Sequence, residues 1–501
     1  MKRLAGGAAL TALVCAMGSA VYAQETTGSI RGQITNEAGA PVSGATVVVT
    51  HVPSATSTTT ITGGDGYFTT RGLRVGGPYT VAVTAPGLPS RTTQIAGVPI
   101  GESVEVDVAL GSAEVAELVV TAAPVADTAV GPRAVFTESV LEAAPAINRD
   151  LRDVLAIDPR VYIDEAFVDA VQCGGANPRF NSLTVDGIRM NDNFGLNSSG
   201  YPTERMPFSY DAIQQVAVEL APFDVEYGGF TACNINAVTK SGGNTFTGSA
   251  FYDFSSDALT GDSLEGQSIE LGDFEEKRWG VSLGGPIVRD RLFFFAAYEK
   301  LDGVNIFDRG PAGSGAGTEV QGLSQAAYNE IVDIANNLYG YDPGGIPAPA
   351  ANEDEKFLLK LDLNITDRHR AAFTYNYNDG YNIAESDGDS DEFEFTGHLY
   401  ERGAELNAYV GQLFSDWTDN FSTEARISYQ ELQNRQISLN GTDVGEVQIN
   451  VTNDHDGDGV ASRAIVYLGS DDSRHSNVLS YETLSFKFGG SYAWNNHLFS
   501  A

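Results

Sequence analysis

The chain between residues 357 and 365 reads Phe357-Leu358-Leu359-Lys360-Leu361-Asp362-Leu363-Asn364-Ile365. Successive side chains of an extended strand point to opposite faces. One face therefore carries Phe357, Leu359, Leu361, Leu363 and Ile365, and the other carries Lys360, Asp362 and Asn364. Residues 421 to 431 repeat this pattern, with Phe421, Ala425, Ile427 and Tyr429 opposite Ser422, Glu424, Arg426, Ser428 and Gln430. The pattern predicts an antiparallel sheet with one apolar and one wet face.

The links between the expected strands alternate in length. We expect strands near residues 245–254, 278–288, 291–300, 356–365, 369–378, 404–414, 420–431 and 480–494, with a ninth beginning at His497. The short links are 289–290, 366–368, 415–419 and 495–496, and the long links are 255–277, 301–355, 379–403 and 432–479. Outer-membrane barrels have short periplasmic turns and long extracellular loops, whereas a soluble sandwich has no reason to keep every second loop long. Residues 244–501 therefore predict part of an outer-membrane β-barrel.

Nine strands cannot close a bacterial barrel, because such barrels have even strand numbers and an open edge in lipid leaves backbone groups unsatisfied. We therefore expect the chain to be the N-terminal part of a longer protein.

The first residues are typical of a signal peptide over residues 1–23. Lys2 and Arg3 precede an apolar stretch, and Val21-Tyr22-Ala23 offers a cleavage site. Beyond residue 23 no run of 18 apolar residues occurs, so the alternatives are a soluble exported protein and a β-barrel. Cleavage leaves Cys173 and Cys233, for which an oxidising compartment favours a disulfide over two buried free thiols.

The charge balance is strongly acidic. Lys and Arg total 30 and Asp and Glu total 66, which gives a formal net charge of −36. This charge repels phosphate backbones and argues against a nucleic-acid partner. The 55 Gly residues, with 10% aromatic and only 19% charged residues, favour β-rich structure over helical arrays.

Residues 28–110 alternate short Val, Thr and Ile runs with Gly- and Pro-rich turns, which predicts a small β-sandwich. This segment resembles the immunoglobulin-like, non-catalytic carboxypeptidase regulatory-like domain in Gly32-Gln33-Ile34-Thr35, Pro41-Val42-Ser43-Gly44-Ala45-Thr46-Val47 and Asp65-Gly66-Tyr67-Phe68. Residues 111–133 are rich in Ala, Val, Thr and Pro. We expect a linker there with one unpaired strand over Glu117-Leu118-Val119-Val120-Thr121-Ala122.

Residues 134–243 combine helical spacing at Leu151, Val154 and Leu155 with strands at 182–185 and 213–220, as an α+β domain would. They resemble the plug domain of TonB-dependent receptors of the Oar-like group. The motifs are Arg152-Asp153-Val154-Leu155, Leu183-Thr184-Val185-Asp186-Gly187-Ile188, Ile213-Gln214-Gln215-Val216, Ala221-Pro222-Phe223-Asp224-Val225-Glu226-Tyr227-Gly228-Gly229 and Asn234-Ile235-Asn236-Ala237-Val238-Thr239-Lys240-Ser241-Gly242. We single out Asp186, Gly187, Pro222, Tyr227, Gly228, Thr239 and Lys240. Most family members have Arg-Gly before Pro222, where this chain has Leu220-Ala221.

The resemblance implies a plug inside a barrel of about 22 strands, a size at which the lumen needs a stopper. It also implies three partners: a TonB-type inner-membrane energy transducer, outer-membrane lipid and an extracellular ligand that the sequence does not identify. Glu117 to Ala122 would be the TonB box, to which the transducer adds a β-strand through main-chain hydrogen bonds. A plain linker strand is the alternative. Ligand contacts should come from the extracellular loops and from plug residues 191–200.

Two segments carry candidate metal ligands. Asp454-His455-Asp456-Gly457-Asp458-Gly459 places alternate carboxylates before Gly, as Ca²⁺ loops do. Ile465 replaces the bidentate Glu of such loops, so we favour a solvated acidic loop over Ca²⁺ at Asp454, Asp456 and Asp458. His398-Leu399-Tyr400-Glu401 has the spacing of two zinc ligands without an identifiable third, and such short matches arise freely. We expect neither a cofactor nor an enzyme.

The sequence thus predicts a mostly β protein of the bacterial outer membrane. It consists of an Ig-like sandwich in the periplasm, an α+β plug domain and the first strands of a large antiparallel transmembrane barrel. The first hypothesis for its function is energy-coupled ligand uptake through the plugged barrel. The second is surface adhesion or signalling, with the same barrel as an anchor.

Overall fold

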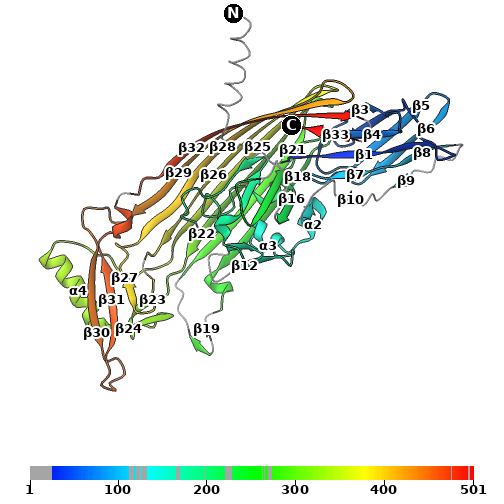
Figure 1. The fold of residues 1–501 in the computed structure, drawn as a ribbon. Helices are drawn as coiled ribbons and strands as arrows, with labels where there is room; N and C mark the ends of the chain where they lie inside the picture. The colour runs from blue at the N-terminus through cyan, green and yellow to red at the C-terminus, as the bar shows by residue number, and fades with distance from the viewer. Residues whose placement is uncertain are drawn as a thin grey trace, which may run out of the picture.

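The computed structural model describes residues 25–111, 118–119, 124–125, 133–164, 170–197, 199–220, 228–261, 263–264, 266–268, 273–386, 388–475, 477–494 and 497–501. The expected signal peptide lies outside these residues. The fold is mostly β, with a sandwich-like N-terminal domain and a large antiparallel sheet of barrel type, as the sequence predicts (Figure 1). In the described part of the chain, no helix has the length and apolar character needed to cross a membrane.

The N-terminal domain packs two sheets face to face. One has the order β10-β7-β1-β4, with β8 beside β1, and the other has the order β3-β2-β5-β6-β9. Alternating inward residues such as Ile30, Val47 and Val81 fill the space between them, as the period of two in these strands requires. The strands are β1 (Thr27–Asn36), β2 (Thr46–His51), β3 (Thr56–Ile61), β4 (Tyr67–Arg74), β5 (Tyr79–Ala85), β6 (Leu88–Ile95), β7 (Ser103–Glu105), β8 (Val108–Leu110), β9 (Leu118–Val119) and β10 (Pro124–Val125).

The expectation of an unpaired strand in the linker is wrong for the part that the structure describes. Leu118 and Val119 form β9, which pairs in parallel with Thr93 and Gln94 of β6. The edge of a sheet presents unpaired backbone N–H and C=O groups, and an extended apolar segment next to it in the chain can satisfy them.

The α+β domain is built on a five-stranded sheet with the order β11-β16-β17-β14-β15, in which β14 and β17 are parallel. Helix α3 begins after Asp150, whose side chain accepts a hydrogen bond from the Arg152 backbone N–H. Leu151, Val154 and Leu155 of this helix are fully buried, as their spacing predicts. The elements are β11 (Arg133–Thr137), α2 (Glu138–Ala143), α3 (Leu151–Leu155), β12 (Val161–Asp164), β13 (Ala170–Cys173), β14 (Ser182–Val185), β15 (Ile188–Arg189), β16 (Ile213–Leu220) and β17 (Cys233–Thr239).

The C-terminal half forms one nine-stranded antiparallel sheet in the predicted strand order. The strands are β18 (Thr247–Ser256), β21 (Glu275–Val288), β22 (Leu292–Asn305), β25 (Ala350–Thr366), β26 (His369–Ala384), β28 (Tyr400–Asp416), β29 (Phe421–Ser438), β32 (Ser480–Trp494) and β33 (His497–Ser500). Several strands run further into the long links than predicted: β25 begins at Ala350 and β29 ends at Ser438.

The two faces of β25 and β29 have the predicted polarity, whereas the inner faces of β22 and β28 also carry buried apolar residues such as Phe295 and Leu406. Lys360 and Asp362 point inward and are buried against the other domains, whereas Ile365 and Ile427 point outward and are exposed. On the outer face, Tyr375 of β26 stacks on Tyr409 of β28 with ring centroids 4.9 Å apart. An apolar, aromatic outer face and a polar inner face are what a barrel wall in lipid requires.

The long links at the far end from the sandwich fold into a unit of their own, the loop subdomain (Figure 1). It contains β23 (Arg309–Ala312), β24 (Thr318–Ser324), α4 (Gln325–Leu338), β27 (Glu392–Glu394), β30 (Val447–Asn453) and β31 (Ser462–Leu468). Its core joins Leu323, Ile331, Phe393, Phe395 and Val466 from three different links. In the remaining long link, β19 (Ser263–Leu264) pairs with β20 (Gln267–Ser268).

Candidate functional site

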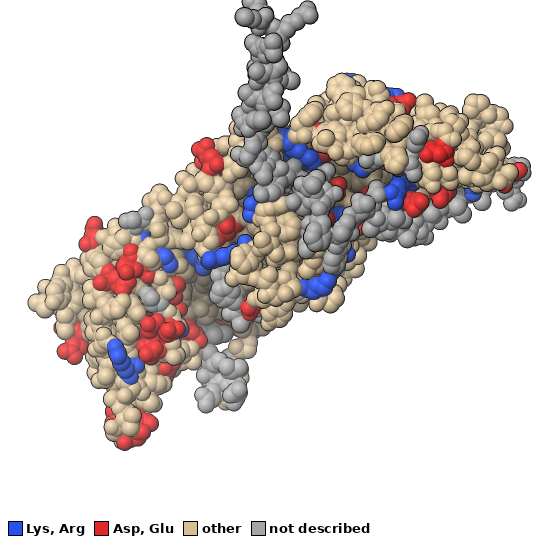
Figure 2. Space-filling model, viewed as in Figure 1, with Lys and Arg blue, Asp and Glu red and all other residues tan. Residues whose placement is uncertain are grey.

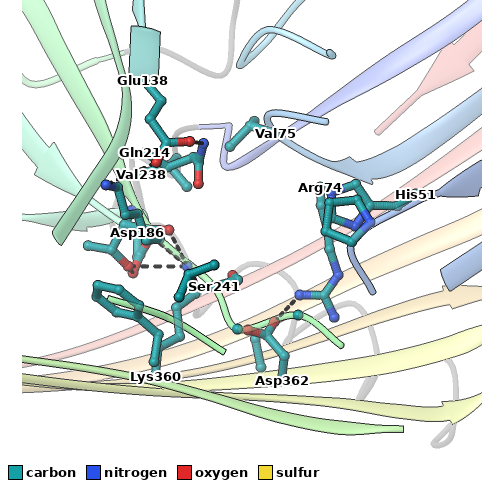
Figure 3. A pocket seen from close by; sticks show the side chains of 18 of the residues that line it. His51, Arg74, Val75, Glu138, Asp186, Gln214, Val238, Ser241, Lys360 and Asp362 are labelled. Carbon is teal, nitrogen blue, oxygen red and sulfur yellow. Dashed lines mark hydrogen bonds and ion pairs between the residues drawn. The ribbon is translucent and has the colours of Figure 1, made fainter. Parts of the chain in front are cut away.

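The inner face of the sheet meets the two domains along an interface that we call the seam. Part of the seam is apolar, since Leu406 and Val410 of β28 pack into the core of the α+β domain, and part is polar and charged. At the end nearest the sandwich the seam contains a cavity of about 390 Å³. The cavity is lined by charged residues from all three units: Arg74 of the sandwich, Asp186 of the α+β domain, and Lys360 and Asp362 of β25 (Figure 3). Because these units are far apart in sequence, the seam is where their relative position is fixed.

The plug motif at Asp186-Gly187 forms the tip of the β14–β15 hairpin. Both residues have positive φ angles, 47° and 81°, which is what a two-residue hairpin turn requires and Asp-Gly favours. The Asp186 carboxylate accepts hydrogen bonds from the Thr239 backbone N–H at 3.0 Å and from the Thr239 hydroxyl at 2.5 Å. The motif residues Asp186 and Thr239 therefore meet at the end of the α+β sheet.

Lys360 of β25 reaches this turn from the barrel wall. Its Nζ lies 3.3 Å from Asp186 Oδ1 and donates to the Thr239 carbonyl oxygen at 3.0 Å. The side chains of Lys360 and Asp186 are only 7% and 3% exposed, so each charge depends on the other for compensation. This is a direct electrostatic link between the α+β domain and the wall.

Gly187 is needed for a second reason besides its φ angle. A Cβ atom built on it would lie 1.8 Å from Nη1 of Arg426, a buried residue of β29. The guanidinium of Arg426 thus covers the backbone of the turn, and its Nη2 lies 3.1 Å from the Thr26 hydroxyl of the sandwich. A side chain at this position would displace the Arg426 guanidinium from the turn.

The sandwich is tied to the seam through Arg74, the last residue of β4. Arg74 donates from Nη1 to Asp362 Oδ1 at 2.5 Å, and the two side chains are 7% and 2% exposed. Arg370 of β26 donates to the Gly72 carbonyl oxygen at 2.6 Å. The backbone N–H of Ile100 also donates to Gln215 of β16 at 3.0 Å, so the sandwich contacts both the wall and the α+β domain.

His51 of β2 lies beside this contact. Burial, with additional repulsion from Arg74 and Arg370, lowers its pKa from 6.5 to about 3, although Asp362 acts in the opposite direction. Its Nδ1 is 2.7 Å from the Ser54 hydroxyl. The ring is therefore neutral at physiological pH.

The seam continues along the wall toward the loop subdomain. Ser209 of the α+β domain donates to Glu299 at 2.8 Å, and Asn376 donates to the Pro207 carbonyl at 2.9 Å. Further on, Glu204 pairs with Arg402 at 3.0 Å. Burial raises the pKa of Glu204, against the opposing effect of Arg402. Polar contacts thus follow the whole length of the α+β domain.

The other residues singled out from the motifs lie around this seam or beyond the described residues. Lys240 pairs with Glu138 of α2 at 2.9 Å, and Gly228 lies in coil before β17. Pro222 and Tyr227 are outside the described part of the chain, as are Glu117, Val120, Thr121 and Ala122 of the TonB box candidate. In the predicted apex loop, Asn197 accepts a hydrogen bond from Arg402 at 2.9 Å.

The cysteines and the candidate metal ligands lie elsewhere. Cys173 and Cys233 form a disulfide with an S–S distance of 2.06 Å, joining β13 to the start of β17. Asp454, Asp456 and Asp458 lie between β30 and β31, all exposed, with carboxylate oxygens within 4.8 Å of one another. A carboxylate oxygen of Glu401 lies 3.7 Å from Arg435 of β29, and the acidic side chains that cluster with His398 are Glu446 and Asp471.

Sequence reasoning placed Lys360, Asp362 and Arg426 on a wet face but missed their partners. Arg74 was not singled out at all. The sequence does contain one indication of the missing partners. Lys360, Asp362 and Arg426 are charged, and burying a charge inside a protein is costly unless it is paired. That signal identifies residues that need a partner, but not which partner they have.

Comparisons with known proteins agree with this architecture. Residues 29–111 match the carboxypeptidase regulatory-like domain, and residues 238–306 match an outer membrane beta barrel domain. The TonB-dependent transporter Oar of Myxococcus xanthus is 35% identical over 140 residues, which are 26% of this chain and 12% of that protein. The chain is thus a relative of Oar and is located in the outer membrane.

Two solved structures show a weaker likeness. The outer membrane transporter YddB from Escherichia coli is 13% identical with a TM-score of 0.48, over 72% of this chain and 45% of that chain. The ferric enterobactin receptor PfeA from Pseudomonas aeruginosa is 14% identical with a TM-score of 0.47, over 73% of this chain and 46% of that chain. This chain spans less than half the length of either structure.

Proposed function

We propose that this relative of the transporter Oar takes up a ligand across the outer membrane through a barrel that its α+β domain closes, driven by a TonB-type transducer. The observation that carries the proposal is the seam: a separate domain lies against the inner face of a barrel-type sheet and is held there by buried contacts such as Lys360 to Asp186. A barrel that served only as an anchor in lipid would not need a separate domain held against its inner face.

The chemistry of the seam suits a plug that has to move. A hydrogen bond within a protein contributes only about 0.5–1.5 kcal/mol, because water offers a replacement when the bond is broken. The polar contacts of the seam, such as that between Ser209 and Glu299, can therefore be replaced by contacts with water when the domain moves. The apolar contacts of Leu406 and Val410 with the core of the domain oppose this movement, so the transducer has to supply work.

The energy input would come through the segment before the α+β domain. Residues 117–122 are the candidate TonB box, and β9 within it pairs with β6 over only two residue pairs. So short a ladder can be exchanged for a strand of the transducer, which would bind by strand addition. A pull on this segment acts on β11, the first described strand of the α+β domain, which pairs with β16 at one edge of the five-stranded sheet.

The test compares growth of a deletion strain, complemented with the full-length gene, on a panel of scarce nutrients. The nutrient whose use depends on the gene is then supplied in labelled form. We expect its uptake to stop when a protonophore is added and when residues 117–122 are deleted, while binding to cells persists. Uptake that survives both treatments contradicts the energy-coupled mechanism.

A second function is favoured by one observation. The loop subdomain has its own hydrophobic core and gathers acidic side chains at its surface (Figure 2). A folded, charged outer unit suits adhesion or signalling as well as ligand capture. Binding of a surface or partner without uptake of any nutrient would support this function instead.

A further inference from the structure

Two long links of the loop subdomain, residues 379–403 and 432–479, meet at one buried histidine. His398 precedes β28, Glu446 precedes β30 and Asp471 follows β31. One donor atom from each of these side chains lies within 4.8 Å of the other two. His398 is 0% exposed and Asp471 3%, whereas Glu446 is half-buried and leaves a path to solvent. The cluster therefore combines one imidazole and two carboxylates from segments that are up to 73 residues apart in the chain.

The orientation of the imidazole is fixed by the backbone. His398 Nδ1 lies 2.9 Å from the carbonyl oxygen of Gly469. A carbonyl oxygen only accepts hydrogen bonds, so Nδ1 carries the proton, and in the neutral ring Nε2 carries the lone pair. Histidines that bind metals have this arrangement, because the hydrogen bond of the other nitrogen sets the tautomer and the ring plane. The ring also packs on Tyr467, with centroids 5.3 Å apart.

The surroundings hold the carboxylates as well. Asp471 accepts a hydrogen bond from the Ser473 backbone N–H at 2.8 Å, and Glu446 accepts one from the Asp472 N–H at 3.2 Å. A third carboxylate, Glu394 of β27, is 1% exposed and has Oε2 3.9 Å from His398 Nε2. Three acidic groups thus surround a single imidazole.

We propose that His398, Glu446 and Asp471 bind one divalent transition-metal ion, for which Zn²⁺ is the best match, with Glu394 next to it as a fourth ligand or an outer partner. Zinc takes nitrogen and oxygen ligands at about 2.0–2.2 Å in tetrahedral geometry, which places ligand atoms roughly 3.4 Å apart. Rotation of the half-buried Glu446 side chain can close the cluster to that spacing. Ca²⁺ and Mg²⁺ prefer oxygen ligands alone, so the imidazole argues against them.

The bound ion would cross-link two segments of the loop subdomain. It would tie the link before β28 to both ends of the β30–β31 hairpin, next to the core that contains Phe393 and Val466. Closing long loops with a metal removes conformational freedom from the unfolded chain. The proposal does not depend on whether the protein transports a ligand.

The test titrates Zn²⁺ into the metal-free full chain in detergent by calorimetry, with the visible absorption of bound Co²⁺ as a second measurement. We expect one equivalent of Zn²⁺ to bind, a tetrahedral Co²⁺ spectrum and a raised midpoint of thermal unfolding. Glu446→Gln keeps the side-chain volume and should weaken Zn²⁺ binding at least tenfold. Because Glu446 is half-buried, this variant should fold, which is checked by its circular dichroism spectrum.

Two control variants separate this site from other acidic groups. Glu401→Gln alters the residue three positions after His398, and Asp456→Asn alters the exposed acidic loop; both should bind Zn²⁺ like the wild type. The proposal is wrong if the chain binds no stoichiometric Zn²⁺, because the cluster is then a buried group of polar side chains that holds no metal. It is equally wrong if Glu446→Gln binds normally, or if Asp456→Asn removes the binding.

Discussion

Arg74 at the end of β4 and Asp362 on the inner face of β25 form an ion pair across 288 residues of chain, with Nη1 and Oδ1 2.5 Å apart. Both side chains are almost completely buried. The N-terminal domain is therefore not a free appendage in this state, because it inserts a charged side chain into the inner face of the wall. A buried pair contributes little net stability over apolar residues of similar size, but removing one partner is costly.

We predict that Asp362→Asn loosens the sandwich. The change leaves the Arg74 charge buried without its carboxylate, which should cost about 3–5 kcal/mol. Cleavage by added protease within residues 111–133 should become faster in the full chain. The double variant Arg74→Met with Asp362→Leu should restore much of the protection.

The control for this prediction is Asp419→Asn, which breaks an ion pair with Arg368 whose side chains are 44% and 30% exposed. Exposed pairs contribute at most about 1 kcal/mol, so protease sensitivity should hardly change. Equal sensitivity of the two single variants would contradict a role for Arg74 and Asp362 in docking.

The second prediction concerns the turn at Gly187. Gly187→Ala adds a Cβ that would lie 1.8 Å from the Arg426 guanidinium. The backbone at this position also has a positive φ angle, which an alanine rarely adopts. We expect the seam to open, so that cells with the full-length variant become sensitive to an antibiotic too large for porins. Gly39→Ala is the matched control, because Gly39 has a φ of 76° and nothing lies within 4 Å of its added Cβ.

The control isolates backbone strain, which costs about 1–2 kcal/mol for an L-residue in the left-handed region. Gly39→Ala should therefore lower the stability of the sandwich slightly and leave antibiotic sensitivity unchanged. If both variants behave alike, the close approach of Arg426 has no role in sealing.

The amino-acid sequence predicted those parts of the fold that depend on local periodicity. The two faces of residues 357–365 follow from a period of two, and α3 follows from the spacing of Leu151, Val154 and Leu155. The same reasoning missed α4, although Ser324 caps it by accepting from the Ala327 N–H at 3.2 Å and Ile331 and Ala335 share its buried side. A link between two barrel strands was expected to be loop, and that expectation hid the helical spacing.

The candidate site could be predicted only in part, because its contacts join distant segments. Periodicity placed Lys360 on a polar face, but its partner Asp186 is 174 residues away. No local pattern indicates which two segments meet across a sheet. The spacing of His398 and Glu401 suggested a pair of ligands, yet Glu401 lies beside Arg435, and Glu446 and Asp471, which cluster with His398, come from another link.

The third prediction is a pH dependence at the docking contact. His51 has a pKa of about 3 in the folded state because burial disfavours its charged form, whereas the unfolded chain protonates it near 6.5. Between these values the unfolded state binds more protons, so stability falls as pH decreases from about 6.5 toward 3, by up to roughly 1.4 kcal/mol per pH unit. Urea unfolding of the sandwich followed at several pH values measures this slope.

His51→Gln separates this effect from the carboxylates that titrate in the same range. The variant should lose stability at pH 7 and show a flatter slope between pH 6.5 and 4.5 than the wild type. Parallel curves for the two proteins would mean that His51 does not titrate on unfolding.

The last prediction concerns the disulfide between Cys173 and Cys233, which are separated by 60 residues in sequence. The bond ties the β12–β13 hairpin to the sheet that carries Asp186 and Thr239.

Closing a loop of this size lowers the entropy of the unfolded chain and so stabilises the folded state by roughly 4 kcal/mol in the chain-entropy account. Replacing both cysteines by serine should lower the stability of the α+β domain by about that amount, measured by chemical unfolding of the full chain with the signal of the barrel sheet as an internal reference. The wall contacts the same domain through Lys360 and Arg426. With the disulfide intact, the α+β domain should stay docked on the wall at denaturant concentrations at which the domain of the double variant has already unfolded and left the wall. Unchanged unfolding of the double variant would show that the contacts with the wall alone hold the domain together.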